Sequence, residues 1–147
     1  LPQNTSKYTA RCLNLSVHMI RAKKTFQPLT SNEICEMYNL LHKEQLVSFP
    51  LTTHAREKID ALVANSTGSS FGHEHYPTIQ EKVFAYFVFI IKAHAFTDGN
   101  KRTAVLVFLV LCSLNSVRFT HNIATLDALA VLVEKTVTNN TDHHAYI

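Results

Sequence analysis

Glycine and proline are scarce in this chain, which has only three Gly and four Pro among its 147 residues. So few turn-forming residues argue against many short strands and favour long helices. The sequence also shows no internal repeat and no low-complexity tract. Its length suits one domain that buries a substantial core. We therefore expect an all-α, single-domain protein.

Cysteine is also rare. The three cysteines, Cys12, Cys35 and Cys112, lie far apart and lack the spacing of a zinc site. Cys112 stands within an apolar run, so buried free thiols are expected, and these fit a reducing compartment.

The sequence lacks the marks of membrane and nucleic-acid-binding proteins. The apolar runs at 83–91 and 105–111 are far shorter than the roughly 20 residues that span a bilayer. Residues 1–20 have no continuous apolar centre like that of a signal peptide. The formal net charge is only +3, without a basic stripe. We expect a cytoplasmic protein with no membrane and no direct nucleic-acid partner; secretion as an effector is the alternative.

Capping signals and the spacing of apolar residues predict about six helices. Thr30 and Thr78 are each followed three residues later by Glu, the arrangement of a capping box. The helix that starts near Thr78 is apolar nearly all round, so it should be central and buried. Residues 65–77, which hold two of the three Gly, predict a flap loop or short hairpin before it. The expected helices cover residues 5–24, 30–45, 53–65, 79–93, 101–115 and 125–137.

Residues 94–104 place polar and charged groups between two buried helices. Buried charge is costly unless it is paired or ligated, so a functional site is expected here. Asp98, Gly99 and Asn100 stand directly before a helix, whose first N–H groups and dipole can bind an anion. Gly99 allows a close backbone approach and a positive φ. Asn100 can hold either a phosphate or the loop itself.

Charged side chains complete this predicted site. Lys101 and Arg102 place two cations beside the helix start, and the Arg fork suits phosphate oxygens. A cation in the first helical turn opposes the helix dipole, which strengthens the case for a bound anion. Asp98 beside phosphates is a natural Mg²⁺ ligand, and His94 suits general-base work near neutral pH. This set predicts transfer of a phosphate-containing group to a hydroxyl.

Residues 94–102, with the sequence HAFTDGNKR, resemble the Fic/Doc (Fido) signature HxFx[D/E][G/A]N[G/K]R. The resemblance extends upstream to Gly72, to residues 76–78 and to residues 81–82, as in Doc-like members. It implies a Fic-like helical core over 30–138. A helical extension over 1–29 and a polar tail over 139–147 would flank that core.

The resemblance also implies a role for each motif position. His94 would deprotonate the target hydroxyl, and Lys101 and Arg102 would act with it in catalysis. Asp98 would bind Mg²⁺, and Phe96 would anchor the loop in the core. The ATP-binding residues would be Gly99, Asn100, Lys101 and Arg102.

Two positions favour the death-on-curing (Doc) branch of the family. AMP-transferring members usually have Gly at the position of Lys101 and a second Arg at the position of Val105. Doc toxins share both departures and resemble kinases that transfer the γ-phosphate. The leading hypothesis is therefore Mg-ATP-dependent phosphorylation of a Ser, Thr or Tyr hydroxyl of a protein. AMP or other nucleotide transfer is the first alternative, and a non-catalytic nucleotide- or peptide-binding module is the second.

The flap before the central helix is expected to position the protein target. Gly72, His73, His75 and Tyr76 would line a channel for a target segment, which could pair with the flap as an added strand. A metal site at residues 73–75 is the weaker interpretation, because the spacing is not specific.

The family's inhibitory pattern, [S/T]xxxE[G/N], is incomplete in this chain. Thr53 and Glu57 match it, but Lys58 stands where Gly or Asn is required. The helix that contains them is therefore expected to be structural. Any restraint on activity would come from an antitoxin or other inhibitory partner supplied in trans.

Overall fold

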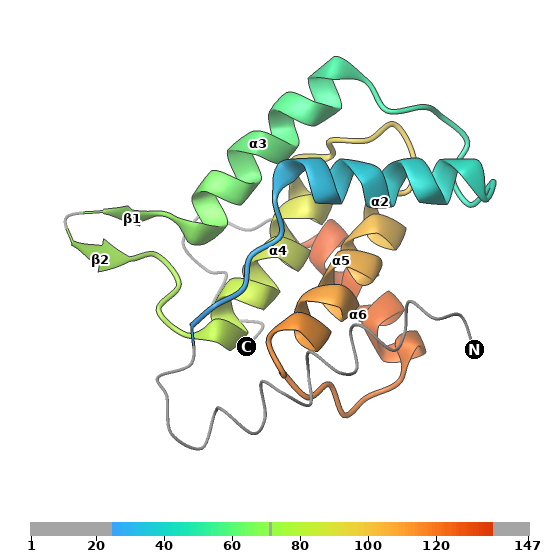
Figure 1. The fold of residues 1–147 in the computed structure, drawn as a ribbon. Helices are drawn as coiled ribbons and strands as arrows, with labels where there is room; N and C mark the ends of the chain where they lie inside the picture. Colours follow the sequence, from blue (N-terminus) through green and yellow to red (C-terminus); the bar gives the residue numbers. More distant parts are fainter. Residues whose placement is uncertain (1–24, 71, 137–147) are drawn as a thin grey trace.

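The computed structural model describes residues 25–70 and 72–136, which form five helices and one two-stranded hairpin. The elements are α2 (Ser31–Lys43), α3 (Thr53–Thr67), β1 (Ser69–Ser70), β2 (His73–Glu74), α4 (Ile79–Ala93), α5 (Asn100–Leu114) and α6 (Ile123–Lys135) (Figure 1). The predicted all-α class is confirmed. The expected helix over 5–24 and the tail over 139–147 lie outside the described residues, so the domain boundaries stay predictions.

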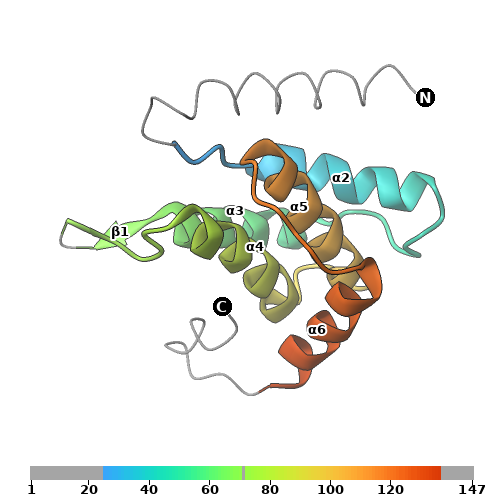
Figure 2. The same cartoon turned by 90° about the horizontal axis from the view of Figure 1, so that it is seen from below.

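Helix α4 forms the centre of the bundle, as its apolar sequence predicts. Eight of its fifteen residues are buried, including the whole run from Ala85 to Val88. It packs against α3, α5 and α6, while α2 packs against α3 and α5 (Figures 1 and 2). Contacts with three other helices hold α4 in the middle of the bundle and so fix the position of the loop that follows it.

Side-chain caps start four of the five described helices. The predicted capping boxes at Thr30 and Thr78 are both present. Helix α3 is capped by Thr52, one residue before the expected Thr53. Helix α6 begins at Ile123, so the predicted start at Thr125 is wrong. The Asn122 side chain is the cap and accepts a hydrogen bond from the Thr125 N–H, which makes Thr125 the third helical residue.

The segment before α2 is fixed to the bundle by long-range hydrogen bonds. The Gln27 N–H donates to the Asn115 side chain over 2.7 Å, and Asn115 donates back to the Gln27 carbonyl over 2.9 Å. The buried Tyr86 hydroxyl donates to the carbonyl of Leu29, and burial raises the pKa of Tyr86 to about 12. These contacts join residues 27–29 to α4 and to the end of α5.

Two of the cysteines lie in the described part of the chain. Cys35 and Cys112 are free and buried, as predicted, and burial raises the pKa of both thiols. Among the helices of residues 25–70 and 72–136, none has the length and apolar character needed to cross a bilayer.

Candidate active site

The candidate active site begins where the central helix stops. Helix α4 ends at Ala93, and His94 follows as its C-cap with φ 45 and ψ 46, in the left-handed region. This conformation turns the chain sharply out of the helix and leaves His94 exposed. The carbonyl of Ala93 accepts a hydrogen bond from the Nζ of Lys58, a residue of α3, over 3.0 Å.

The loop after His94 is held from inside. Phe96 is 4% exposed, and its ring stacks on Tyr38 with centroids 4.0 Å apart and planes 8° from parallel. The Asn100 side chain accepts from the Phe96 N–H over 3.0 Å and donates to the Phe96 carbonyl over 2.8 Å. Of the two roles that the sequence leaves open for Asn100, this geometry shows the one in which it holds the loop.

Gly99 lets the loop turn into α5. Its φ is +81, and a Cβ added there would lie 2.2 Å from Cγ1 of Val47. Both observations require glycine, because L-residues avoid this region and no atom fits at that distance. The helix that follows has no side-chain cap and no acidic residue in its first turn. Its first N–H groups are therefore left for water or an anion.

Two cations stand in the first turn of this uncapped helix. The Lys101 Nζ lies 2.8 Å from an Oε2 of Glu134, a residue of α6. The Arg102 guanidinium donates to the carbonyl of Leu46. Positive charge at a helix N-terminus is unfavourable without a compensating anion. In this structure the only anion shown to bind either cation is Glu134, among the residues described.

The motif residues line a common pocket of about 470 Å³. It is lined by Glu134 and by the motif residues His94, Phe96, Thr97, Asp98, Gly99, Asn100, Lys101 and Arg102. The structure thus brings together all seven motif residues that the sequence singled out. It adds Glu134, 33 residues beyond Lys101, which no motif marks.

Glu134 gives the pocket one fixed negative charge. The hydrogen bond from Lys101 lowers the pKa of Glu134, although partial burial works in the opposite direction. The carboxylate is therefore ionised at neutral pH. Its ion pair with Lys101 is lost only when the pH falls below 4.5, the ordinary pKa of a glutamate side chain.

Replacing Glu134 with Gln should strengthen anion binding in this pocket. The substitution removes a competing carboxylate and frees Lys101, so the affinity for a phosphate-bearing anion should rise about two- to fivefold, the scale of a partly exposed ion pair. Titration calorimetry with ATP measures the change. Glu57→Gln on α3 removes an equal charge from an exposed residue that does not line the pocket. Equal affinities in the two variants would contradict this prediction.

Asp98 is the one carboxylate of the motif loop. Its Oδ2 accepts a hydrogen bond from the Ser48 N–H over 3.3 Å. Burial first, and the Asp98 charge second, raise the pKa of the neighbouring Tyr38. The described residues contain no group of three or more His, Cys, Asp and Glu side chains that could hold a metal by themselves. Asp98 fits Mg²⁺ only in the mode that combines one carboxylate with phosphate oxygens.

The segment 46–49 supports the motif from outside the pocket. Leu46 and Ser48 supply the backbone groups that bind Arg102 and Asp98, and Val47 packs on Gly99. The carbonyl of Phe49 accepts from the Tyr38 hydroxyl over 2.7 Å. The sequence of this stretch carries no motif, and neither periodicity nor capping signals that its backbone meets a loop about 50 residues away.

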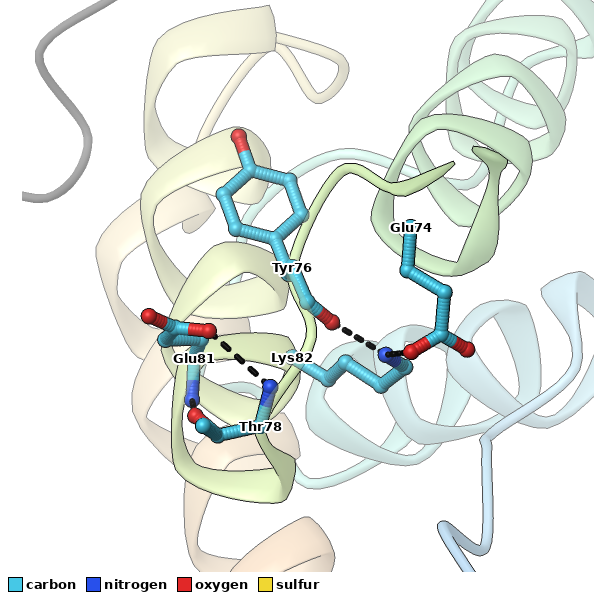
Figure 3. A network of polar contacts seen from close by, with 5 residues as sticks. All are labelled: Glu74, Tyr76, Thr78, Glu81 and Lys82. Carbon is cyan, nitrogen blue, oxygen red and sulfur yellow. Dashed lines mark hydrogen bonds and ion pairs between the residues drawn. The ribbon is translucent and has the colours of Figure 1, made fainter. Parts of the chain in front are cut away.

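The flap is a short antiparallel hairpin in which Ser69 pairs with Glu74 and Ser70 with His73. Its base is tied to α4 by Lys82, whose Nζ binds Glu74 over 3.1 Å and also donates to the carbonyl of Tyr76 (Figure 3). This ammonium is nearly buried, so the two contacts are its compensation for lost water.

None of the four flap residues lines the motif pocket. The hairpin precedes the first residue of α4, whereas His94 follows the last, and a 15-residue helix is about 22 Å long. Gly72, His73 and His75 are exposed, and Nε2 of His75 lies 2.6 Å from the Ser70 hydroxyl. Tyr76 is 7% exposed and packs edge-on against Phe89. Its ring therefore belongs to the core.

Comparison with known protein families identifies the family to which this chain belongs. The model of the Fic/DOC family matches residues 28–112, more than half of the chain. The protein therefore belongs to the Fic/DOC family. Membership indicates nucleotide-dependent protein modification by a transferase. No curated protein and no solved structure matches the chain.

Proposed function

We propose that this protein transfers the γ-phosphate of ATP to a Ser, Thr or Tyr hydroxyl of another protein. The observation that carries the proposal is the pocket at the start of α5. An uncapped helix N-terminus and two first-turn cations lie there beside an exposed histidine. Such a site attracts phosphate groups through N–H donors, the helix dipole and charge-assisted hydrogen bonds. A loop that served only to cap a helix would need none of the cations.

Each residue of the pocket has a separate role in the proposed phosphoryl transfer. His94 accepts the proton of the target hydroxyl while that oxygen forms its bond to the γ-phosphorus. The bond from this phosphorus to the β–γ bridging oxygen breaks, and ADP leaves. The N–H groups at the start of α5, with Lys101 and Arg102, stabilise the charge on the transferring group. Asp98 would hold Mg²⁺, which neutralises phosphate charge when bound.

Lys101 and Val105 support phosphate transfer over AMP transfer. Val105 is only 8% exposed and packs in the core, so this position supplies no cation to the pocket. The AMP-transferring members of the family usually have an Arg at this position. That Arg would hold the γ-phosphate as part of the leaving group. Lys101 lines the pocket at the position where those members have Gly. Its side chain takes space that the α- and β-phosphates would otherwise fill.

Two elements could receive the protein target. The segment 46–49 touches the motif directly, and the side chains of Leu46 and Phe49 are about half exposed there. A target strand paired with the flap would need about six or seven residues to reach His94 along α4, at roughly 3.3 Å per residue. We retain the flap as a docking site for a more distant part of the target. An inhibitory partner in trans would act by covering either element.

Isotopic labelling tests the reaction. The protein is incubated with Mg²⁺ and ATP labelled at the α- or the γ-phosphorus, together with the proteins of a cell lysate. The expected result is protein-bound label from γ-ATP alone and a gain of one phosphate in intact mass. Label from α-ATP would replace the proposal with nucleotide transfer. Tight ATP binding without any transfer would replace it with a non-catalytic binding module.

A further inference from the structure

Two lysines form hydrogen bonds at the C-terminal end of α4. Lys58 of α3 donates to the carbonyl of Ala93, the last residue of the helix, over 3.0 Å. Lys92, a residue of α4 itself, donates to the carbonyl of Thr136, the C-cap of α6. The carbonyls at a helix end have no intrahelical partner and carry the negative end of the dipole, so an ammonium is a favourable partner for them.

Only one of these two contacts controls the backbone of the next residue. The carbonyl of Ala93 and the N–H of His94 belong to the same planar peptide unit. The His94 Cα lies in the same plane. A hydrogen bond that holds the Ala93 oxygen therefore also limits rotation of the peptide plane that leads into His94. His94 has a φ of 45, in the left-handed region, which few residues other than Gly occupy although Asn, Asp and His are enriched there. The hydrogen bond from Lys58 stabilises this turn from outside its own backbone.

The neighbours of Lys58 on α3 do not share this contact. Glu57 is exposed and does not line the pocket. Arg56 is also exposed, and its guanidinium points to α2, where it binds the Asn32 side chain over 2.5 Å. Lys58 is the residue at which the chain departs from the inhibitory-helix pattern. In this fold that position is occupied by a side chain that reaches the turn carrying His94.

We propose that Lys58 is a positioning residue for His94. It anchors the Ala93–His94 peptide plane so that the imidazole faces the pocket at the start of α5. The inference rests on the proposed function for its kinetic consequence, but the anchoring itself is a property of the folded chain. Lys58 touches neither the pocket nor any group that reacts, so its effect passes through His94.

Lys58→Met tests this role because it keeps the aliphatic stem and removes the ammonium. The expected kcat for transfer of label from γ-ATP to the acceptor found in the lysate is about 10- to 100-fold lower, the cost of a misplaced catalytic group. The KM for ATP should stay within about twofold, since ground-state binding of the phosphates is untouched. Lys58→Arg should restore most of the rate. Arg56→Met, which removes a cation from the same helix, should change neither constant.

Amide hydrogen exchange gives a readout that needs no activity. Lys58→Met should increase exchange in residues 94–97 and leave α5 unchanged, whereas Arg56→Met should leave both unchanged. Unaltered exchange at 94–97 overturns the inference, as does an unaltered kcat in an active protein. If the parent protein transfers no label, the proposed function fails, and the exchange experiment still decides the role of Lys58. Should Lys58→Met not fold, Lys58→Gln serves with the same criteria.

Discussion

Replacing His94 with Ala should slow transfer from ATP by about 100- to 10,000-fold, the range that a general base contributes. His94 is the only histidine among the described residues that line the pocket, and histidine is the side chain that most often serves as a general base. The same substitution should leave ATP binding intact, because the phosphates are held by α5, Lys101 and Arg102. Label transfer from γ-ATP measures the first effect, and titration calorimetry measures the second.

The fold should survive this substitution. His94 is exposed, so its removal leaves no cavity, and the free energy of unfolding should change by less than about 1 kcal/mol. His94→Asn is the matched control, because Asn tolerates the left-handed conformation of this turn and cannot act as a base near neutral pH. Both variants should be inactive and folded. Undiminished transfer by either one would remove His94 from the mechanism.

Local sequence signals predicted the helices that carry the site. The capping box at Thr78 and the apolar run that follows placed α4 at residues 79–93, the bounds that the structure has. This success has a physical cause: caps and apolar periodicity act within a few residues of one another. The start of α6 was missed by two residues: Asn122 is the cap, in line with the general preference for Asn over Thr at this position.

The partners of the motif could not be predicted in the same way. Glu134 reaches Lys101 from 33 residues away, and Lys58 reaches Ala93 from 35 residues away. Such contacts depend on how far each helix is rotated about its axis and where it crosses its neighbour. The spacing of apolar residues defines the buried face of a helix. It does not identify which residue of a neighbouring helix a given side chain contacts. The motif itself was found because its nine residues are contiguous in the sequence.

The docking role of the flap stays a prediction, and the structure adds where the flap lies. The hairpin of β1 and β2 precedes α4 as expected, yet the length of α4 separates it from His94. The order of the elements already implied this separation, because the flap precedes a predicted 15-residue helix and His94 follows it. The segment 46–49 carries no motif and lies against Asp98 and Arg102.

Gly99→Ala should destabilise the protein by about 2–5 kcal/mol, the sum of two separate costs. A left-handed conformation costs an L-residue about 1–2 kcal/mol, and φ here is +81. Forcing a methyl group into a packed site costs about 1–3 kcal/mol more, since the new Cβ would lie 2.2 Å from the Val47 side chain. Denaturant unfolding followed by circular dichroism measures the loss.

Gly72→Ala and Val47→Ala separate the two costs. Gly72 has a φ of +78 with no atom within 4 Å of an added Cβ, so its substitution by Ala should show the conformational cost alone. Val47→Ala removes the atom that an Ala at position 99 would strike. Combined with Gly99→Ala, it should therefore cost less than the sum of the two single changes. Strict additivity would show that the loop at 99 has moved away from Val47. The close approach of segment 46–49 to the motif would then not be what requires glycine.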